Sequence, residues 1–219
     1  MKYPKPNTHR LFEIAGITVF AALWLFLFID MIMQSPAFLT DRNMFWVLPV
    51  TLAAYLFSDF VSGMVHFMGD TYCNPDTPII GPGFIKPFRD HHVHPEAITI
   101  HDFVELTGNS CLAGIPLLGI AFVLFSESSG FLHFIILLFI LFFSLSVIIT
   151  NIFHKWAHQV NRSGIVLWLQ RSGLILSPVN HAIHHSDPFN RHYCMTNGWL
   201  NPLLDKLKFF TAIKKISGK

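Results

Sequence analysis

The sequence predicts an all-α integral membrane protein with four transmembrane helices, a histidine-rich cytoplasmic cap and interfacial amphipathic helices. Three observations lead to this fold class. Of the 219 residues, 52% are hydrophobic and only 13% are charged, and the mean hydropathy is +0.48, whereas a soluble domain carries about 25% charged residues. The apolar residues gather in four long runs. Nearly all basic residues and histidines lie outside those runs, in segments that four crossings would place on one side of a membrane.

The four apolar runs are long enough, or nearly so, for transmembrane helices. A helix needs roughly 20 residues to cross a hydrocarbon core of about 30 Å. Three runs meet this length, and the third in order, Cys111–Phe125, meets it only when it is extended back to Thr107. The first run is too long for the core of a signal peptide and no small-residue cleavage site follows it, so we expect an uncleaved anchor. We expect transmembrane helices at about 12–33, 44–68, 107–125 and 131–153, in a single domain covering 1–219.

The basic residues predict the orientation of these helices. Four crossings place both termini and the 69–105 segment on one side, and the loops 34–43 and 126–130 on the other. Of the 15 Lys and Arg residues, all except Arg42 fall on the first side. Basic residues are enriched in cytoplasmic loops. We therefore expect the termini and the 69–105 segment to be cytoplasmic.

The histidines follow the same partition, with 11 of the 13 near the cytoplasmic surface. Neutral imidazole binds transition metals such as zinc, iron and copper. Two histidines four residues apart share one face of a helix, as in HKWAH (154–158), and HAIHH (181–185) adds spacings of three and four. The adjacent pair His91 and His92 would point about 100° apart on a helix, which suits two neighbouring metals. One zinc needs three or four protein ligands, so the histidines predict two metal ions rather than one.

Two aspartates near these histidines are candidate catalytic residues. Asp70 follows His66 by four residues and is expected either to bind a metal or to orient the His66 ring. Asp59 lies seven residues before His66, on the same stripe and deeper in the apolar run. An intramembrane carboxylate is a candidate functional residue. The structural alternative for Asp59 is a hydrogen bond to a polar partner such as Asn109 or Asn151.

Several other segments predict local features. The three cysteines are widely spaced and indicate neither a disulfide framework nor a cysteine metal site. Residues 165–176 and 203–215 have the pattern of amphipathic helices in the membrane interface. The proline and glycine content of 74–87 indicates an ordered loop, which we expect to cover the metal site. Lys86 and Arg89 are candidates for binding a lipid phosphate, although snorkelling at the membrane surface explains them equally well.

Five segments of the chain resemble the lipid desaturase family, in order and with similar spacing between about 55 and 205. This family includes the plasmanylethanolamine desaturases and a plant plastid enzyme that makes a trans-unsaturated acyl chain in phosphatidylglycerol. The short stretches LILS (174–177) and NPLLD (201–205) lean toward the plant branch. The five segments are DFVSGMVHFMGDT (59–71), PFRDHHVHPEAITIHDFVE (87–105), HKWAH (154–158), LILSPVNHAIHHSDP (174–188) and YCMTNGWLNPLLD (193–205).

The resemblance implies a membrane-bound oxidase with two iron ions that uses O2 to desaturate a chain of a phospholipid, either by forming a vinyl ether or within an acyl chain. It also implies an external electron donor of the cytochrome b5, ferredoxin or flavodoxin type, and no nucleic-acid partner. His94 and His192 fall outside the family pattern. The residues that match the pattern of metal ligands, together with Asp70, are His66, His91, His92, His101, His154, His158, His181, His184 and His185.

Three alternatives compete with desaturation. A membrane hydroxylase would use the same centre and differ only in transferring oxygen to the substrate. A divalent-metal transporter would need polar residues through the middle of several membrane helices, but 134–143 is rich in Phe, Leu and Ile. A histidine-rich scaffold without turnover explains the spacings worst.

Overall fold

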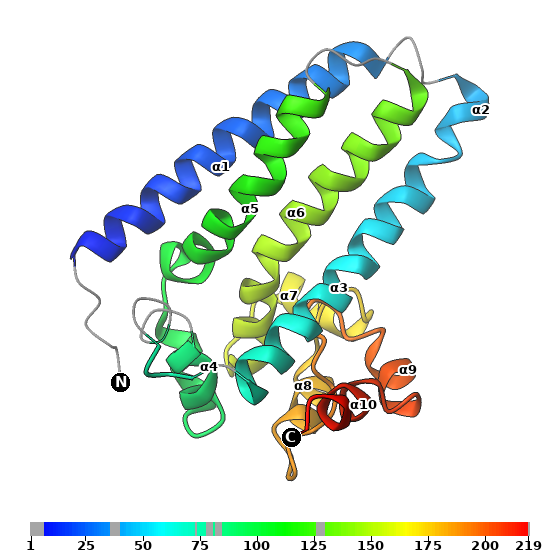
Figure 1. The fold of residues 1–219 in the computed structure, drawn as a ribbon. Coiled ribbons are helices and arrows are strands. Elements are labelled where there is room, and N and C mark those ends of the chain that lie inside the picture. The colour runs from blue at the N-terminus through cyan, green and yellow to red at the C-terminus, as the bar shows by residue number, and fades with distance from the viewer. Residues whose placement is uncertain are drawn as a thin grey trace. The chain divides into compact units, whose positions relative to one another are not determined.

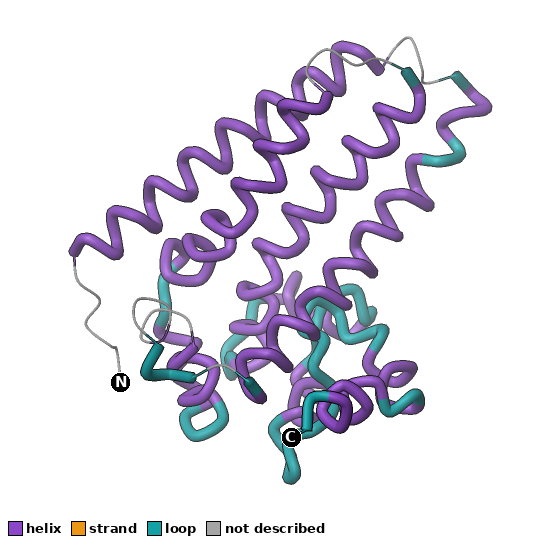
Figure 2. Tube along the Cα trace, viewed as in Figure 1, coloured by secondary structure: helices purple, strands orange, loops and turns teal. Residues whose placement is uncertain are grey.

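The computed structural model of the chain describes residues 7–35, 40–72, 74–77, 81, 85–125 and 130–218. Throughout these residues the chain forms helices, turns and loops, and no strand occurs among them (Figure 1, Figure 2). The predicted all-α fold is confirmed. The helices are α1 (Asn7–Gln34), α2 (Asp41–Met44), α3 (Val47–Thr71), α4 (Lys86–His91), the 3-10 helix η3 (Pro95–Ile100), α5 (Phe103–Phe125), α6 (Phe131–His158), α7 (Gly164–Arg171), α8 (Pro178–His184), α9 (Asn201–Lys206) and α10 (Phe209–Ile216).

Four of these helices, α1, α3, α5 and α6, are long and apolar enough to cross a membrane. They correspond one to one to the four predicted helices, so the prediction of a multi-pass membrane protein is confirmed. The second predicted helix differs at its start, because the chain forms the short α2 and turns at Phe45 and Trp46 before α3 begins. Both α3 and α6 continue beyond their apolar runs, to Thr71 and to His158. These extra turns carry Asp70 and the two histidines of HKWAH.

Helix α5 begins at Phe103, four residues before the start expected from hydropathy. The backbone N–H of Glu105 donates to Oδ1 of Asp102 over 3.0 Å, and the backbone N–H of Asp102 donates to Oε2 of Glu105 over 3.1 Å. This reciprocal pair is a capping box, which satisfies N–H groups that have no partner within the helix. Because both capping residues are charged, the apolar run does not extend to the true start of the helix.

Replacing Asp102 by alanine is expected to lower the free energy of unfolding by about 1 kcal/mol, because the cap loses its acceptor. Asp102→Asn retains an acceptor oxygen and loses only the charge that faces Arg10 across 2.8 Å at the surface, so its loss should be smaller. Thermal unfolding of the three proteins in one detergent measures the difference. Equal midpoints for Asp102→Ala and the unsubstituted protein would contradict the capping role.

The chain divides into two compact units. The first, here called the membrane-helix unit, comprises residues 5–58 and 102–148, and the second, the histidine-bearing unit, comprises 1–4, 59–101 and 149–219. Helices α3 and α6 are each divided between the two units: the first part of α3 and of α6 belongs to the membrane-helix unit, and the last part of each belongs to the histidine-bearing unit. The expectation of one domain over the whole chain stays a prediction.

In the membrane-helix unit, α1 and α5 lie side by side along their lengths (Figure 1). Glycine at position 108 permits their close approach, since a Cβ there would lie 2.5 Å from Cβ of Glu13. The indole N–H of Trp24 donates to the carbonyl of Leu141 on α6 over 3.1 Å. The buried core of this unit is aliphatic and aromatic, with Leu27, Leu118 and Leu137 among its fully buried side chains.

In the histidine-bearing unit, a second core forms around Phe67 of α3 and Phe210 of α10, whose ring centroids are 5.0 Å apart. The expected amphipathic helix at 203–215 is corrected to two helices, α9 and α10. They are separated at Lys208, whose backbone is left-handed with φ of 52°. Six of the fourteen residues of the expected loop at 74–87, namely 78–80 and 82–84, lie outside the described residues, so its position over the site stays a prediction.

Candidate metal centre

Five histidine rings converge inside the histidine-bearing unit. Their Nε2 atoms meet in pairs, and six of these pairs are separated by 2.6–3.0 Å. The rings come from three separate stretches of sequence: the end of α4, two turns of α6, and α8 with the residue that follows it. We call this set the five-histidine group; it consists of His91, His154, His158, His181 and His185.

Local structure explains how α8 presents its histidines. Ser177 caps the helix by accepting the backbone N–H of Asn180 over 3.2 Å, and Pro178 occupies its first turn. The cap starts the helix in a register that places His181 and His185 one turn apart on the same face, as the spacing of four predicts. On α6, the same spacing aligns the two histidines of HKWAH.

A second group of potential metal ligands contains three histidines and one carboxylate. Oδ2 of Asp70 lies 3.0 Å from Nε2 of His92, 3.4 Å from Nε2 of His66 and 3.6 Å from Nε2 of His184. The Nε2 atoms of His66 and His184 are 3.1 Å apart. We call these four residues the histidine–aspartate group. Helix α3 supplies two of them at a spacing of four residues.

The two groups lie next to each other, and adjacent residues in the sequence divide between them. His91 belongs to the five-histidine group and His92 to the histidine–aspartate group, while His185 and His184 divide in the same way. The ring centroids of His92 and His185, one from each group, are 5.2 Å apart. The arrangement expected for His91 and His92, with two neighbouring sites, is therefore what the geometry provides.

The residues of both groups fit metal ions. Two nitrogens that bind one ion at about 2.1 Å and at right angles lie about 3 Å apart, as the Nε2 atoms do in the five-histidine group. A neutral imidazole has a single N–H, so converging rings cannot all be satisfied by one another. Oδ1 of Asp70 is also buried without a hydrogen-bond partner among the described residues. A cation in each group would satisfy these atoms.

The environment of the rings favours the neutral form that binds metals. Burial, with the neighbouring imidazoles, holds the pKa values of His91 and His181 well below the ordinary value for histidine. For His185 the same causes lower the pKa to about 3. Since metal ligation requires an unprotonated nitrogen, these rings are ready to bind a cation at neutral pH.

A hydrogen bond outside the two groups sets the orientation of His184. Its Nδ1 lies 3.0 Å from the carbonyl oxygen of Arg191. A carbonyl can only accept, so Nδ1 carries the proton, and Nε2 presents its lone pair to the group. Tyr193 packs against the same ring, with centroids 5.0 Å apart. Sequence reasoning assigned neither Arg191 nor Tyr193 to the site, because both act through the tertiary fold rather than through a recognisable spacing.

A pocket of about 230 Å³ adjoins the histidine–aspartate group. Asp70 and His92 line it together with Tyr193, and Arg89 and Lys214 add two positive charges to the same lining. The pocket therefore holds two cationic side chains beside a candidate metal ligand.

Two residues assigned to the site from the sequence lie outside both groups. His101 follows η3 in extended conformation. Its backbone carbonyl accepts a hydrogen bond from Nζ of Lys155 over 2.7 Å. Its ring is in neither group. Asp59 is fully buried and accepts four backbone N–H groups, three on Oδ1 from 196–198 and one on Oδ2 from Leu200, over 3.0–3.2 Å. The hydrogen bonds expected as its structural alternative therefore exist, but to the backbone rather than to a side chain such as Asn109 or Asn151.

The two histidines outside the family pattern also lie outside both groups. His94 precedes η3 at its N-terminus. Nε2 of His192 lies 3.3 Å from Oδ2 of Asp205, a carboxylate that belongs to neither group.

The chain matches one family model and several known proteins. The sequence profile of the lipid desaturase domain matches residues 55–217. The chain is 41% identical over 208 residues to a plasmanylethanolamine desaturase of Myxococcus xanthus, covering 94% of this chain and 71% of the relative. It is 38% identical over 171 residues to plasmanylethanolamine desaturase 1 of Mus musculus, covering 75% of this chain and 62% of the relative.

A plant relative is less similar. Fatty acid desaturase 4, chloroplastic, of Arabidopsis thaliana is 29% identical over 211 residues, covering 95% of this chain and 61% of the relative. The stretches LILS and NPLLD favoured the plant branch, and this expectation is corrected. The sequence identity over the whole matched length is higher to the two plasmanylethanolamine desaturases than to the plant enzyme, and it outweighs two short stretches. No solved structure matches the chain.

Proposed function

Because the chain belongs to the lipid desaturase family, we propose that it uses O2 to desaturate a chain of a membrane glycerophospholipid at a centre of two iron ions. The observation that carries the proposal is the pair of adjacent ligand groups at the ends of α3 and α6. Vinyl-ether formation in a plasmanylethanolamine is the form favoured by the identity to two plasmanylethanolamine desaturases. Desaturation of an acyl chain is the alternative form.

The five-histidine group would hold one ion and the histidine–aspartate group the other. Iron supplies the redox chemistry by which O2 removes two hydrogens from adjacent carbons of the lipid chain. Overall, one O2, two electrons and two protons are consumed with the two substrate hydrogens, and two waters and a carbon–carbon double bond are formed. Asp70 is the one carboxylate in either group and would bring negative charge to the second ion. In this proposal His101 is not a ligand, and Asp59 is an anchor of the backbone rather than a catalytic residue.

The surroundings of the centre suit the chemistry. His66 and His184 are almost fully buried, so water has little access to these two ligands, and this limits competing reactions of a strong oxidant. Asp70 and His92 of the same group line the pocket. The ligands of α3 and α6 stand at the ends of apolar helices, so a lipid chain can remain in apolar surroundings while it reaches the site. We place this end on the cytoplasmic side because 14 of the 15 basic residues fall there in the expected topology.

The pocket beside Asp70, which carries two cations, is a candidate site for the lipid headgroup. Arg89 reaches this pocket while its Nε donates to the carbonyl of Gly69 over 3.1 Å. Lys214 is the second cation there, and Lys86, the other basic residue expected to bind phosphate, does not line it. We therefore assign phosphate binding to Arg89 and Lys214 in place of the pair Lys86 and Arg89. In vinyl-ether formation, the carbons that lose hydrogen adjoin the ether oxygen on glycerol. The headgroup would therefore lie near the metal ions, as a phosphate in this pocket would.

The product of the reaction tests the proposal. In a host that makes no plasmalogens and is supplied with a 1-O-alkylglycerol, the protein is expected to produce ethanolamine phospholipids that have lost two hydrogens and are cleaved by acid. Acid-stable products with the same mass change would indicate acyl-chain desaturation, and products with an added oxygen would indicate a hydroxylase. His158→Ala should make none of them. Iron-loaded protein without any lipid product would contradict the proposal.

A further inference from the structure

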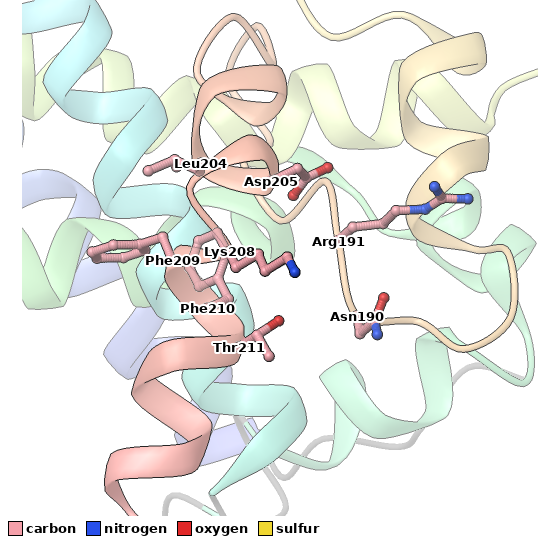
Figure 3. Close-up of a pocket in the computed structure, with 8 residues that line it drawn as sticks. All are labelled: Asn190, Arg191, Leu204, Asp205, Lys208, Phe209, Phe210 and Thr211. Atoms are coloured by element: carbon pink, nitrogen blue, oxygen red, sulfur yellow. The ribbon is translucent and has the colours of Figure 1, made fainter.

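A second pocket of about 250 Å³ opens on the surface of the histidine-bearing unit. It is formed by the segment that follows α8, by α9 and α10, and by the turn between these two helices (Figure 3). Arg191 comes from the first of these segments and Lys208 from the turn, and both side chains are exposed. The headgroup pocket described above has different lining residues. Neither the metal groups nor the lipid site therefore accounts for this pocket.

The lining of the pocket carries two basic side chains, Arg191 and Lys208, and one acidic side chain, Asp205. From residue 189 to the end of the chain the sequence contains six Lys and Arg residues and a single acidic residue, Asp205. That carboxylate is already engaged, since Oδ2 lies 3.3 Å from Nε2 of His192 and Oδ1 accepts the backbone N–H of the same residue. The net charge of the surface is positive, and such a field attracts acidic partners.

One wall of the pocket is joined directly to the candidate metal centre. The carbonyl oxygen of Arg191 accepts the Nδ1 proton of His184 over 3.0 Å, and the His184 ring is fully buried within the histidine–aspartate group. A single hydrogen bond therefore separates a surface residue from a candidate metal ligand. Electrons pass between a protein surface and a buried metal more readily along bonds and hydrogen bonds than across empty space.

The proposed reaction needs electrons from outside the chain. Two of the four electrons that reduce O2 to two waters come from the lipid as it loses two hydrogens. The other two must be delivered by a reductant, together with two protons from water. A carrier that delivers one electron at a time has to dock, transfer and leave twice in each turnover, and this calls for a small interface guided by charge.

We propose that the basic surface formed by Arg191 and Lys208 docks a small, soluble, acidic one-electron carrier protein, and that its electrons enter through the Arg191 carbonyl and His184. The inference rests on the proposed desaturation for its need of electrons. An anionic membrane is the other possible partner of a basic surface. It fits less well, because Phe210 of α10 is buried in the core of the unit, and Phe209 and Ile213 pack against the same core. Three apolar side chains of α10 therefore pack within the protein, while Ile216 at its end is exposed.

The first test measures docking without turnover. The full chain, with its metal, is placed in nanodiscs of phosphatidylcholine, and binding of an acidic plant-type [2Fe–2S] ferredoxin is measured by biolayer interferometry. The double substitution Arg191→Glu with Lys208→Glu is expected to weaken binding by about 10-fold or more. Lys215→Glu makes a charge change of the same sign at an exposed residue outside the pocket, and should change binding less than about 2-fold. Binding by the unsubstituted chain should also weaken as salt is raised.

The second test measures electron entry. Oxidised protein is mixed anaerobically with reduced ferredoxin or with reduced methyl viologen, a small donor that needs no docking surface. The double substitution should slow reduction by ferredoxin about 10-fold or more and leave reduction by viologen unchanged. A centre that viologen cannot reduce would contradict the proposed function, while the binding measurement would still decide the docking proposal.

Two outcomes would overturn the docking proposal. One is ferredoxin binding that is equal in the double variant and the unsubstituted protein. The other is loss of co-purified phosphatidylglycerol from the double variant while ferredoxin binding is retained, which would assign the surface to anionic lipid.

Discussion

Replacing His184 by alanine is expected to lower the metal content from about two ions per chain to about one, and to reduce desaturation by more than about 100-fold. His184 is fully buried, and its Nε2 lies 3.1 Å from Nε2 of His66 and 3.6 Å from Oδ2 of Asp70. Its loss leaves the histidine–aspartate group with three ligands. Even partners outside the ligand set typically change metal affinity or activity by 10–100-fold, so a ligand should have a larger effect.

The measurement is metal analysis by mass spectrometry on detergent-purified protein from iron-supplied cells. His101→Ala is the matched control. The family pattern includes His101, but its ring lies outside both groups, so this variant should retain about two irons. His181→Ala removes a ligand from the five-histidine group instead and should also lose about one ion.

Three outcomes would contradict this assignment. Loss of iron from His101→Ala as severe as that from His184→Ala would place His101 among the ligands. One zinc per chain, or no metal after growth with iron, would exclude the centre of two irons. Metal transport into liposomes by the unsubstituted protein would favour the function of a transporter over that of an oxidase.

Replacing Asp59 by alanine is expected to destabilise the histidine-bearing unit by about 4 kcal/mol or more. Each buried donor left without an acceptor costs about 1–3 kcal/mol, and Asp59 is the acceptor for four backbone N–H groups. The segment that Asp59 holds directly follows Arg191 and Tyr193, which contact the candidate ligand His184. Release of this segment would disturb both contacts. We therefore expect Asp59→Ala to lose both its folded state and its bound metal.

The neighbours of Asp59 on α3 serve the same purpose. Oγ of Ser62 accepts the backbone N–H of Met195 over 2.9 Å. At Gly63, a Cβ would lie 2.7 Å from Sγ of Cys194, so glycine allows the 194–200 segment to approach the helix closely. This face of α3 is a docking face for a later segment of the chain.

Asp59→Asn separates anchoring from catalysis. The amide oxygen can replace Oδ1 and accept the three N–H groups of 196–198, and only the bond from Leu200 is lost. We expect this variant to be destabilised by about 1–3 kcal/mol, to retain its metal and to desaturate lipid at a rate within a few-fold of the unsubstituted protein. Thermal unfolding, metal content and product formation would be measured on the same preparations. An Asn variant that folds and binds metal but has no activity would restore a catalytic role for Asp59.

Much of the fold follows from local features of the sequence. Length and apolarity alone predict the four membrane helices, because lipid demands internal hydrogen bonding over a fixed thickness. Spacings of four residues predict that His66 with Asp70, and His154 with His158, share helix faces, because those distances are set within one helix. The start of α5 is missed for a related reason: its capping box at Asp102 is polar and adds nothing to hydropathy.

The residues themselves determined the fold class, the number of membrane helices and the kind of side chain available to a metal. The tertiary structure alone decided which histidines meet, since His91 and His154, whose Nε2 atoms are 2.9 Å apart, are separated by 63 residues. It also decided that Asp59 holds a backbone segment 137 to 141 residues away, and that His101 stays outside both groups. The physical reason is that periodicity relates side chains within a single helix, whereas a metal site requires atoms from several segments to converge within a few ångströms.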